Sequence, residues 1–206
     1  MKSHGPVLAA AILLPLCAAA GPAPQNDLRE FRVGMPVSAL PQSGYGAFAC
    51  ANDSSRKIED WQDYKACPAA SDGLRAVSFR YDTGSDDGQT IVGGQPVTLA
   101  LLIDDSAGVA GLRIETDPHT RLYLHKKAYL FALQVRARFG DDGWTCRKTE
   151  PTATEQPVGG VFVNEHCEKL TESRRFLLDR QLFRDPAKDL RDFTDATQLT
   201  ILKAPG

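Results

Sequence analysis

The cysteines are the residues of this sequence whose type and spacing most directly indicate chemistry. The chain has five, of which Cys17 lies in an apolar N-terminal run. The other four form an even set without a Cys-x-x-Cys motif, which is typical of structural disulfides in an exported protein rather than of a zinc site or a redox centre. The sequence therefore predicts two disulfides among Cys50, Cys67, Cys146 and Cys167.

Three pairings of these cysteines are possible, and a repeated pattern favours one of them. In both Tyr45–Cys50 and Phe139–Cys146, an aromatic residue and a glycine precede an aromatic-x-Cys sequence. The second cysteine of each couple is followed by a strand-like run. We infer a degenerate duplication with two local bridges, Cys50–Cys67 and Cys146–Cys167. Chance similarity between two short windows is the alternative explanation.

Histidines and acidic residues supply the other candidates for chemistry. His119, His125 and His166 do not have the spacing of a metal site, and ordinary structural histidines are the simpler interpretation. The acidic loop Asp82–Asp87 departs from the spacing of a calcium-binding loop. The sequence has neither a Gly-x-Ser-x-Gly elbow nor a phosphate-binding glycine loop. We therefore expect no metal site, no cofactor and no catalytic residues.

Two aromatic residues are the candidate binding residues. Trp61 and Tyr64 lie between Cys50 and Cys67, in a segment that the predicted disulfide would clamp. Large aromatic side chains on a constrained loop are typical of a protein-binding hot spot. The alternative is that Trp61 lies over the disulfide and fills the core.

The N-terminus carries a targeting signal. Residues 1–20 have the basic start, apolar run and small residues of a signal peptide, and residues 21–26 form a Pro-rich, flexible start of the mature chain. A lipid anchor at Cys17 is an alternative, although Leu16 is larger than the residue that a lipobox prefers. We expect a periplasmic protein without a transmembrane segment once the signal is removed.

The composition argues against nucleic acid as a partner. The 206 residues include 24 Lys and Arg against 26 Asp and Glu, which gives a net charge of −2. Such a balance, without a basic cluster, argues against nucleic-acid binding.

Hydrophobic patterns indicate the elements that position these residues. Alternation predicts a strand over 74–81, and a hairpin of 97–103 with 109–115 in which Gly108 takes the positive φ of the turn. Apolar residues spaced by three and four predict a long helix over 121–139. Further strands are expected over 144–148, 161–168, 174–183 and 198–202.

This order of elements indicates an α+β fold. Runs of strands with one strong helix and no repeated βαβ spacing predict an antiparallel sheet packed by helices. We expect two divergent, disulfide-containing α+β modules, 27–103 and 104–206, the second of which includes the long helix.

The segment Phe31-Arg32-Val33-Gly34-Met35, followed by a turn and a disulfide-flanked region, resembles the repeat of the β-lactamase-inhibitor proteins and of BamE-type envelope lipoproteins. The resemblance covers the N-terminal third and the cysteine layout. It implies a tandem α+β fold and a module that presents a sheet face or loops to another protein, and it supplies no interface residues.

Together these observations predict an exported, non-enzymatic binding protein of the bacterial envelope, whose partner is another envelope or secreted protein. A periplasmic protein that binds a small molecule or a metal ion is an alternative, with His119, His125 and the Asp82–Asp87 loop as ligands. An envelope hydrolase is the other alternative.

Overall fold

The computed structural model describes residues 25–82, 88–125 and 127–205. Its helical segments are η1 (Val37–Ala39), η2 (Trp61–Ala66), α1 (Leu122–His125) and α2 (Ala128–Phe139). Its strands are β1 (Tyr45–Cys50), β2 (Asp53–Lys57), β3 (Arg75–Tyr81), β4 (Ile91–Val92), β5 (Gln95–Ile103), β6 (Val109–Thr116), β7 (Trp144–Lys148), β8 (Val163–Leu170), β9 (Arg174–Arg184) and β10 (Phe193–Lys203).

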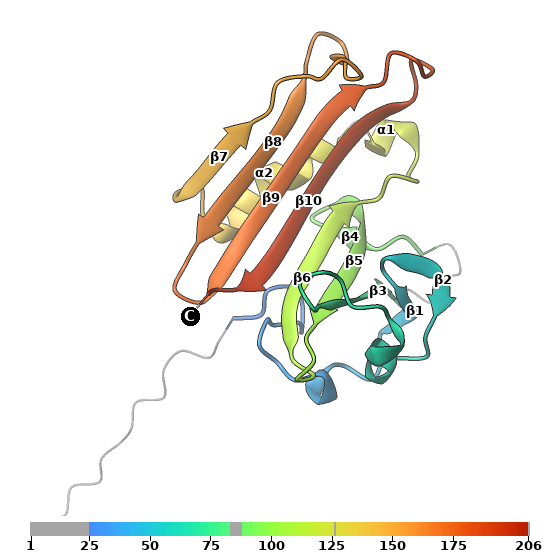
Figure 1. Ribbon diagram of the computed structural model, residues 1–206, viewed down its shortest axis with the longest axis vertical. Helices are drawn as coiled ribbons and strands as arrows, with labels where there is room; N and C mark the ends of the chain where they lie inside the picture. Colours follow the sequence, from blue (N-terminus) through green and yellow to red (C-terminus); the bar gives the residue numbers. More distant parts are fainter. Residues whose placement is uncertain (1–24, 83–87, 126, 206) are drawn as a thin grey trace, which may run out of the picture.

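All of these strands belong to one antiparallel sheet. Its order is β2-β1-β3-β5-β6-β10-β9-β8-β7, with the short β4 paired to β5 (Figure 1). One half runs β2-β1-β3-β5-β6, the other is the four-stranded meander β7-β8-β9-β10, and the two halves meet where β6 pairs with β10. The predicted module boundary at residues 103 and 104 falls in the turn between β5 and β6.

The expected α+β class is wrong, because the protein has a mainly-β fold. Two departures from the predicted elements explain this. The predicted helix over 121–139 is split into the single turn of α1 and the three turns of α2, and the strand predicted over 198–202 extends over the 11 residues of β10. The strand predicted over 174–183 is confirmed as β9. Between Pro36 and Pro41 the chain forms only the 3₁₀ turn η1, because proline cannot donate the hydrogen bonds of a longer helix.

Two rows of apolar side chains cross one face of the sheet and form the core. Each row joins five strands through neighbouring residues, and its members are buried: Val77, Leu101, Leu112, Ile201 and Phe176 in one row, and Phe79, Leu99, Ile114, Leu199 and Leu178 in the other. We call this face the inner face. It is the main apolar interior of the described residues.

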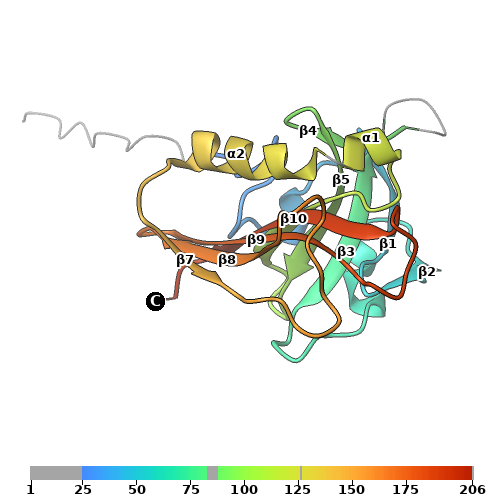
Figure 2. The same cartoon turned by 90° about the horizontal axis from the view of Figure 1, so that it is seen from above.

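Different elements cover the inner face over the two halves of the sheet. Figure 2 shows α2 lying along one side of β8, β9 and β10. The predicted apolar stripe of this helix is buried there at Ala128, Phe131 and Val135. Over the other half, Phe31 of the N-terminal segment packs against Phe79, with 5.0 Å between ring centroids. Over this half an irregular N-terminal segment therefore covers the sheet, where the expected first α+β module would have a helix.

Both disulfides have the predicted pairing. Cys50–Cys67 joins the end of β1 to the residue after η2, whereas Cys146–Cys167 joins directly opposite residues of β7 and β8. They fit the expectation of an exported protein.

The predicted signal peptide over 1–20, with Cys17, lies outside the described residues, as do residues 21–24. Within the described part of the chain, the helices are too short or too polar to cross a membrane.

A buried ion pair holds the N-terminal segment against the second half of the sheet. Arg174, at the start of β9, donates from Nε to Asp27 Oδ1 over 2.9 Å and from Nη2 to Asp27 Oδ2 over 3.1 Å. Asp27 Oδ2 also accepts from the backbone N–H of Val33 over 2.7 Å. Both charged side chains are largely withdrawn from water, so each depends on the other for compensation.

We expect Arg174→Ala to lower the free energy of unfolding by about 3–5 kcal/mol, because it leaves the Asp27 carboxylate buried without its counter-ion. Urea unfolding followed by fluorescence measures this loss. The control is Arg175→Ala, which removes an adjacent arginine whose pair with Glu168 is far more exposed, and it should cost less than about 1 kcal/mol. Equal losses in the two variants would contradict the assignment.

The junction between the two halves includes one glycine with no room for a side chain. A Cβ added to Gly111 of β6 would lie 2.9 Å from the carbonyl oxygen of Ile201 and 2.7 Å from Cδ2 of Leu202, both on β10. Leu102 of β5 closes the other side at 3.1 Å. The close approach of β6 to β10 therefore requires glycine here.

Gly111→Ala should destabilise the protein by about 1–3 kcal/mol, because the added methyl forces β6 and β10 apart. A thermal melt compared with that of Gly46→Ala tests this, since no heavy atom lies within 4 Å of a Cβ at Gly46. A Gly111→Ala protein as stable as the Gly46→Ala protein would show that the junction can relax at no cost.

Candidate functional site

The predicted aromatic binding residues lie in the core. Trp61 is 2% exposed and Tyr64 is 4% exposed. The Trp61 ring makes edge contacts with Phe31 and Phe79, at 5.6 and 4.9 Å between centroids, and its Nε1 donates to the carbonyl oxygen of Pro41 over 2.8 Å. The structure therefore shows the core arrangement of Trp61, and neither ring has a surface to offer a partner.

Trp61→Ala should lower the free energy of unfolding by about 3–5 kcal/mol, because it removes a fully buried indole from the centre of an aromatic cluster. Chemical denaturation measures this loss. Trp144→Ala serves as a control, since Trp144 is half-buried on β7 and should cost less. A Trp61→Ala protein with unchanged stability would contradict the core assignment.

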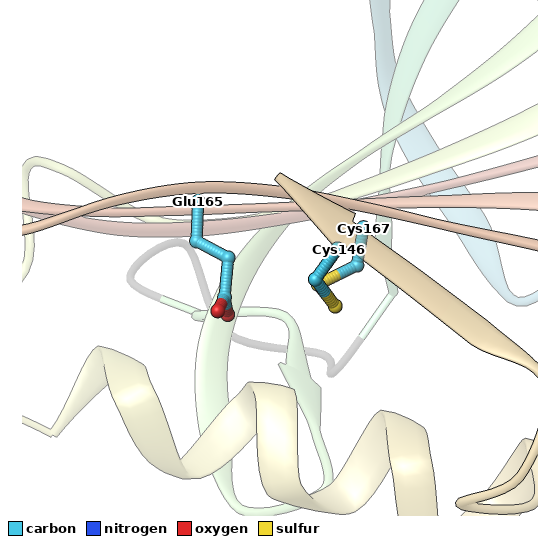
Figure 3. A group of neighbouring side chains, drawn as sticks. All are labelled: Cys146, Glu165 and Cys167. Carbon is cyan, nitrogen blue, oxygen red and sulfur yellow. A yellow bond between two sulfur atoms is a disulfide. The ribbon is translucent and has the colours of Figure 1, made fainter. Parts of the chain in front are cut away.

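A cysteine and carboxylate cluster resembles a metal site but lacks the ligands of one. Cys146, Glu165 and Cys167 place one potential ligand atom each within 4.8 Å of the others (Figure 3). Both sulfurs are bonded to each other, so neither is a thiolate. The Arg136 guanidinium also lies 3.3 Å from the Cys146 sulfur. This cluster is a disulfide with neighbouring charges.

His119 and His166 lie in unrelated environments. The side chain of His119 is 91% exposed beside Asp117. His166 on β8 pairs with Asp179 on β9 through Nδ1, over 2.6 Å. His125 is the last residue of α1, and its side chain lies outside the described residues. Of the predicted acidic loop, residues 83–87 also lie outside them. The described residues therefore do not bring the predicted ligands together.

The face of the sheet opposite the core is the larger functional candidate, and we call it the outer face. In that face one row of directly paired residues runs through Ala49, Ser78, Ala100 and Arg113. The first three side chains are small and come from the adjacent strands β1, β3 and β5. Over these strands the outer face is therefore hollow, whereas larger side chains fill the inner face.

This hollow is the floor of an open cleft of about 790 Å³. Its walls come from separate parts of the chain: the hairpin strand β2, the segment at Gln89 and Thr90, and the turn after β6. The side chains that line the walls are Ser54, Lys57, Arg80, Gln89, Thr90, Thr98, Arg113, Glu115, Asp117 and His119. Its volume lies within the range of about 300–1,000 Å³ that is typical of ligand sites.

The cleft carries more cationic than anionic side chains. Lys57, Arg80 and Arg113 stand against the two carboxylates of Glu115 and Asp117. Among the described residues, none of these three cations forms an ion pair within 4.0 Å. Free cationic groups around a small-residue floor can hold a carboxylate of an incoming ligand.

The cleft was not predicted from the sequence. Of the residues that line it, His119 was the one named as a possible ligand. The sequence does contain small residues at alternating positions, such as Ser78 between Val77 and Phe79. They form a cleft floor only because β1, β3 and β5 pair with each other. Since β1 was not predicted, the row that crosses these strands could not be assembled.

No protein-family model matches this chain, and no curated protein or solved structure matches it either.

Proposed function

We propose that this chain is an exported, non-enzymatic binding protein of the bacterial envelope, which binds another envelope or secreted protein through the outer face of its sheet. The observation that carries the proposal is the cleft over β1, β3 and β5, where small residues leave an open hollow in an otherwise filled sheet. A protruding loop of a partner fits such a hollow better than a flat surface does.

The charges of the cleft favour a particular partner. Lys57, Arg80 and Arg113 outnumber the carboxylates of the lining, so a loop with an acidic side chain at its tip is the favoured occupant. The rigid floor is supplied by strands whose other face is fixed in the core. A preformed site of this kind binds without a large ordering cost.

The chemistry of the outer face also agrees with binding. His166 and Asp179 form a pair that could act as a general base, but this pair faces Arg147 and Gln198 along the neighbouring strands rather than a serine, threonine or cysteine. The pairing supplies no nucleophile next to the histidine. We therefore assign this pair to the cross-strand contacts of β8 and β9.

Binding of a small molecule in the same cleft is the second candidate function. His119 lies at the rim of the cleft, and the cleft volume suits a small ligand as well as a loop. Such a ligand would bind to the purified protein alone, whereas the protein-binding proposal requires a macromolecular partner.

In-cell photo-crosslinking tests the proposal. A photoreactive residue at Ser54, an exposed position in the wall of the cleft, should capture one dominant protein, whereas the same residue at the exposed Leu133 of α2, on the covered side of the sheet, should not. Thr98→Trp, which fills the cleft, should reduce the capture at least tenfold. Leu133→Trp is the matched control and should leave it unchanged.

Two results would overturn the proposal. Capture of the same protein from Leu133 and not from Ser54 would place the interface on the helix side. Full capture by the Thr98→Trp protein, with an unchanged melting temperature, would show that the partner does not enter the cleft.

A further inference from the structure

A second cavity lies on the other side of the sheet, beneath the first turn of α2. Its volume is about 310 Å³, at the lower end of the range of small-molecule sites. Val163 of β8 and Leu182 of β9 line it from the sheet, and Tyr129 lines it from α2. This cavity is separate from the cleft of the proposed function, because the sheet lies between the two.

One charged side chain in this cavity is buried without a hydrogen-bonded partner among the described residues. Asp195 of β10 is 6% exposed and lines the cavity. Among the described residues, its carboxylate accepts no hydrogen bond and has no cation within 4.0 Å. Burial of an unpaired carboxylate is costly, and such groups in folded proteins are usually paired.

The cation that lines the same cavity already has an anionic partner. Arg180 of β9 lines the same cavity and donates from Nη1 to Glu165 Oε2 over 3.2 Å. The Arg180 and Glu165 charges therefore compensate each other, although the buried Nε of Arg180 has no hydrogen-bond partner among the described residues. The Asp195 charge remains. Desolvation raises the pKa of Asp195 to about 6, and the Arg180 charge opposes this rise. At neutral pH the group of Arg180, Glu165 and Asp195 thus carries one net negative charge.

The rim of the cavity is apolar and open to solvent. Tyr129 is 49% exposed and Val161 is 51% exposed, and both line the cavity. Exposed apolar side chains around a partly buried hollow are typical of a ligand entrance. The walls at Val163 and Leu182 continue this apolar surface toward Asp195.

We propose that this cavity binds a small, largely apolar molecule that carries one protonated amine. The ammonium group pairs with the Asp195 carboxylate, and the apolar part contacts Val163, Leu182 and the Tyr129 ring. A metal ion fits less well, because Asp195 is the one carboxylate that lines the cavity among the described residues and hard cations require several oxygen ligands. This inference is independent of the proposed partner on the outer face.

Calorimetric titration with matched probes tests the inference. The probes are hexylamine, cyclohexylmethylamine and phenethylamine, each compared with the alcohol of the same skeleton. An ammonium–carboxylate hydrogen bond contributes about 1.5–3 kcal/mol, so at least one amine should bind about tenfold more tightly than its alcohol. Asp195→Asn should abolish this preference. The control Asp142→Asn removes an exposed carboxylate of the loop before β7 and should preserve it.

The pH dependence supplies a second readout. The titratable or charged groups around Asp195 are Arg180 and Tyr129, which line the same cavity, and Glu165, which pairs with Arg180. The probe amines remain protonated in neutral and acidic buffer. Binding should therefore strengthen between about pH 5 and about pH 8 as Asp195 ionises, and Asp195→Asn should remove this change.

Protein stability reports whether the variant folds. The raised pKa means that Asp195 destabilises the fold increasingly as pH rises from about 4 through about 6. Asp195→Asn should then melt higher than the wild type above pH 6. The inference is overturned if every amine binds no more tightly than its alcohol, or if the preference survives in a folded Asp195→Asn protein.

Discussion

The pairing of β6 with β10 is the interaction on which the rest of the structure depends. Each half of the sheet ends in one of these two strands, and their pairing makes the two rows of apolar side chains continuous. Ile114 lies opposite Leu199 and Leu112 opposite Ile201, so the cores of the two halves become one. Gly111 permits this contact because a side chain there would collide with β10. The buried pair of Asp27 with Arg174 then fixes the N-terminal segment across the junction.

A continuous sheet with one core face leaves its other face available for binding. Because side chains alternate between the faces, the residues that fill the core at Val77 and Phe79 fix Ser78 on the outer face between them. The small residues of that face form the cleft, and the core behind them keeps the cleft floor rigid. The cavity beneath α2 arises differently, since there the helix spans the end of the sheet and Asp195 interrupts the apolar inner face.

The sequence predicted well those elements whose signal is local. The strand at 74–81, the hairpin around residues 104–108, the bridges of the cysteines and the buried stripe of α2 all depend on residues close in the chain. Strands β1 and β2 were missed, because β1 is rich in glycine and alanine and β2 is exposed along its whole length. In the hairpin the positive φ belongs to Ala107 rather than Gly108, since the Asp104 side chain accepts from the N–H groups of Ser106 and Gly108 and shapes the turn.

The candidate sites were harder to predict, because their meaning depends on pairing between distant strands. Trp61 has the composition of a binding residue, yet the fold places it against Phe31, which lies 30 positions earlier in the chain, and uses it as core. Asp195 shows the reverse case. The strand predicted from the sequence covers only 198–202, so Asp195 lay outside it as an ordinary polar residue. Strand β10 begins at Phe193, and its register with Leu182 places Asp195 on the inner face. A buried carboxylate there raises the energy of the empty cavity, and that unfavourable charge is what a cationic ligand would neutralise.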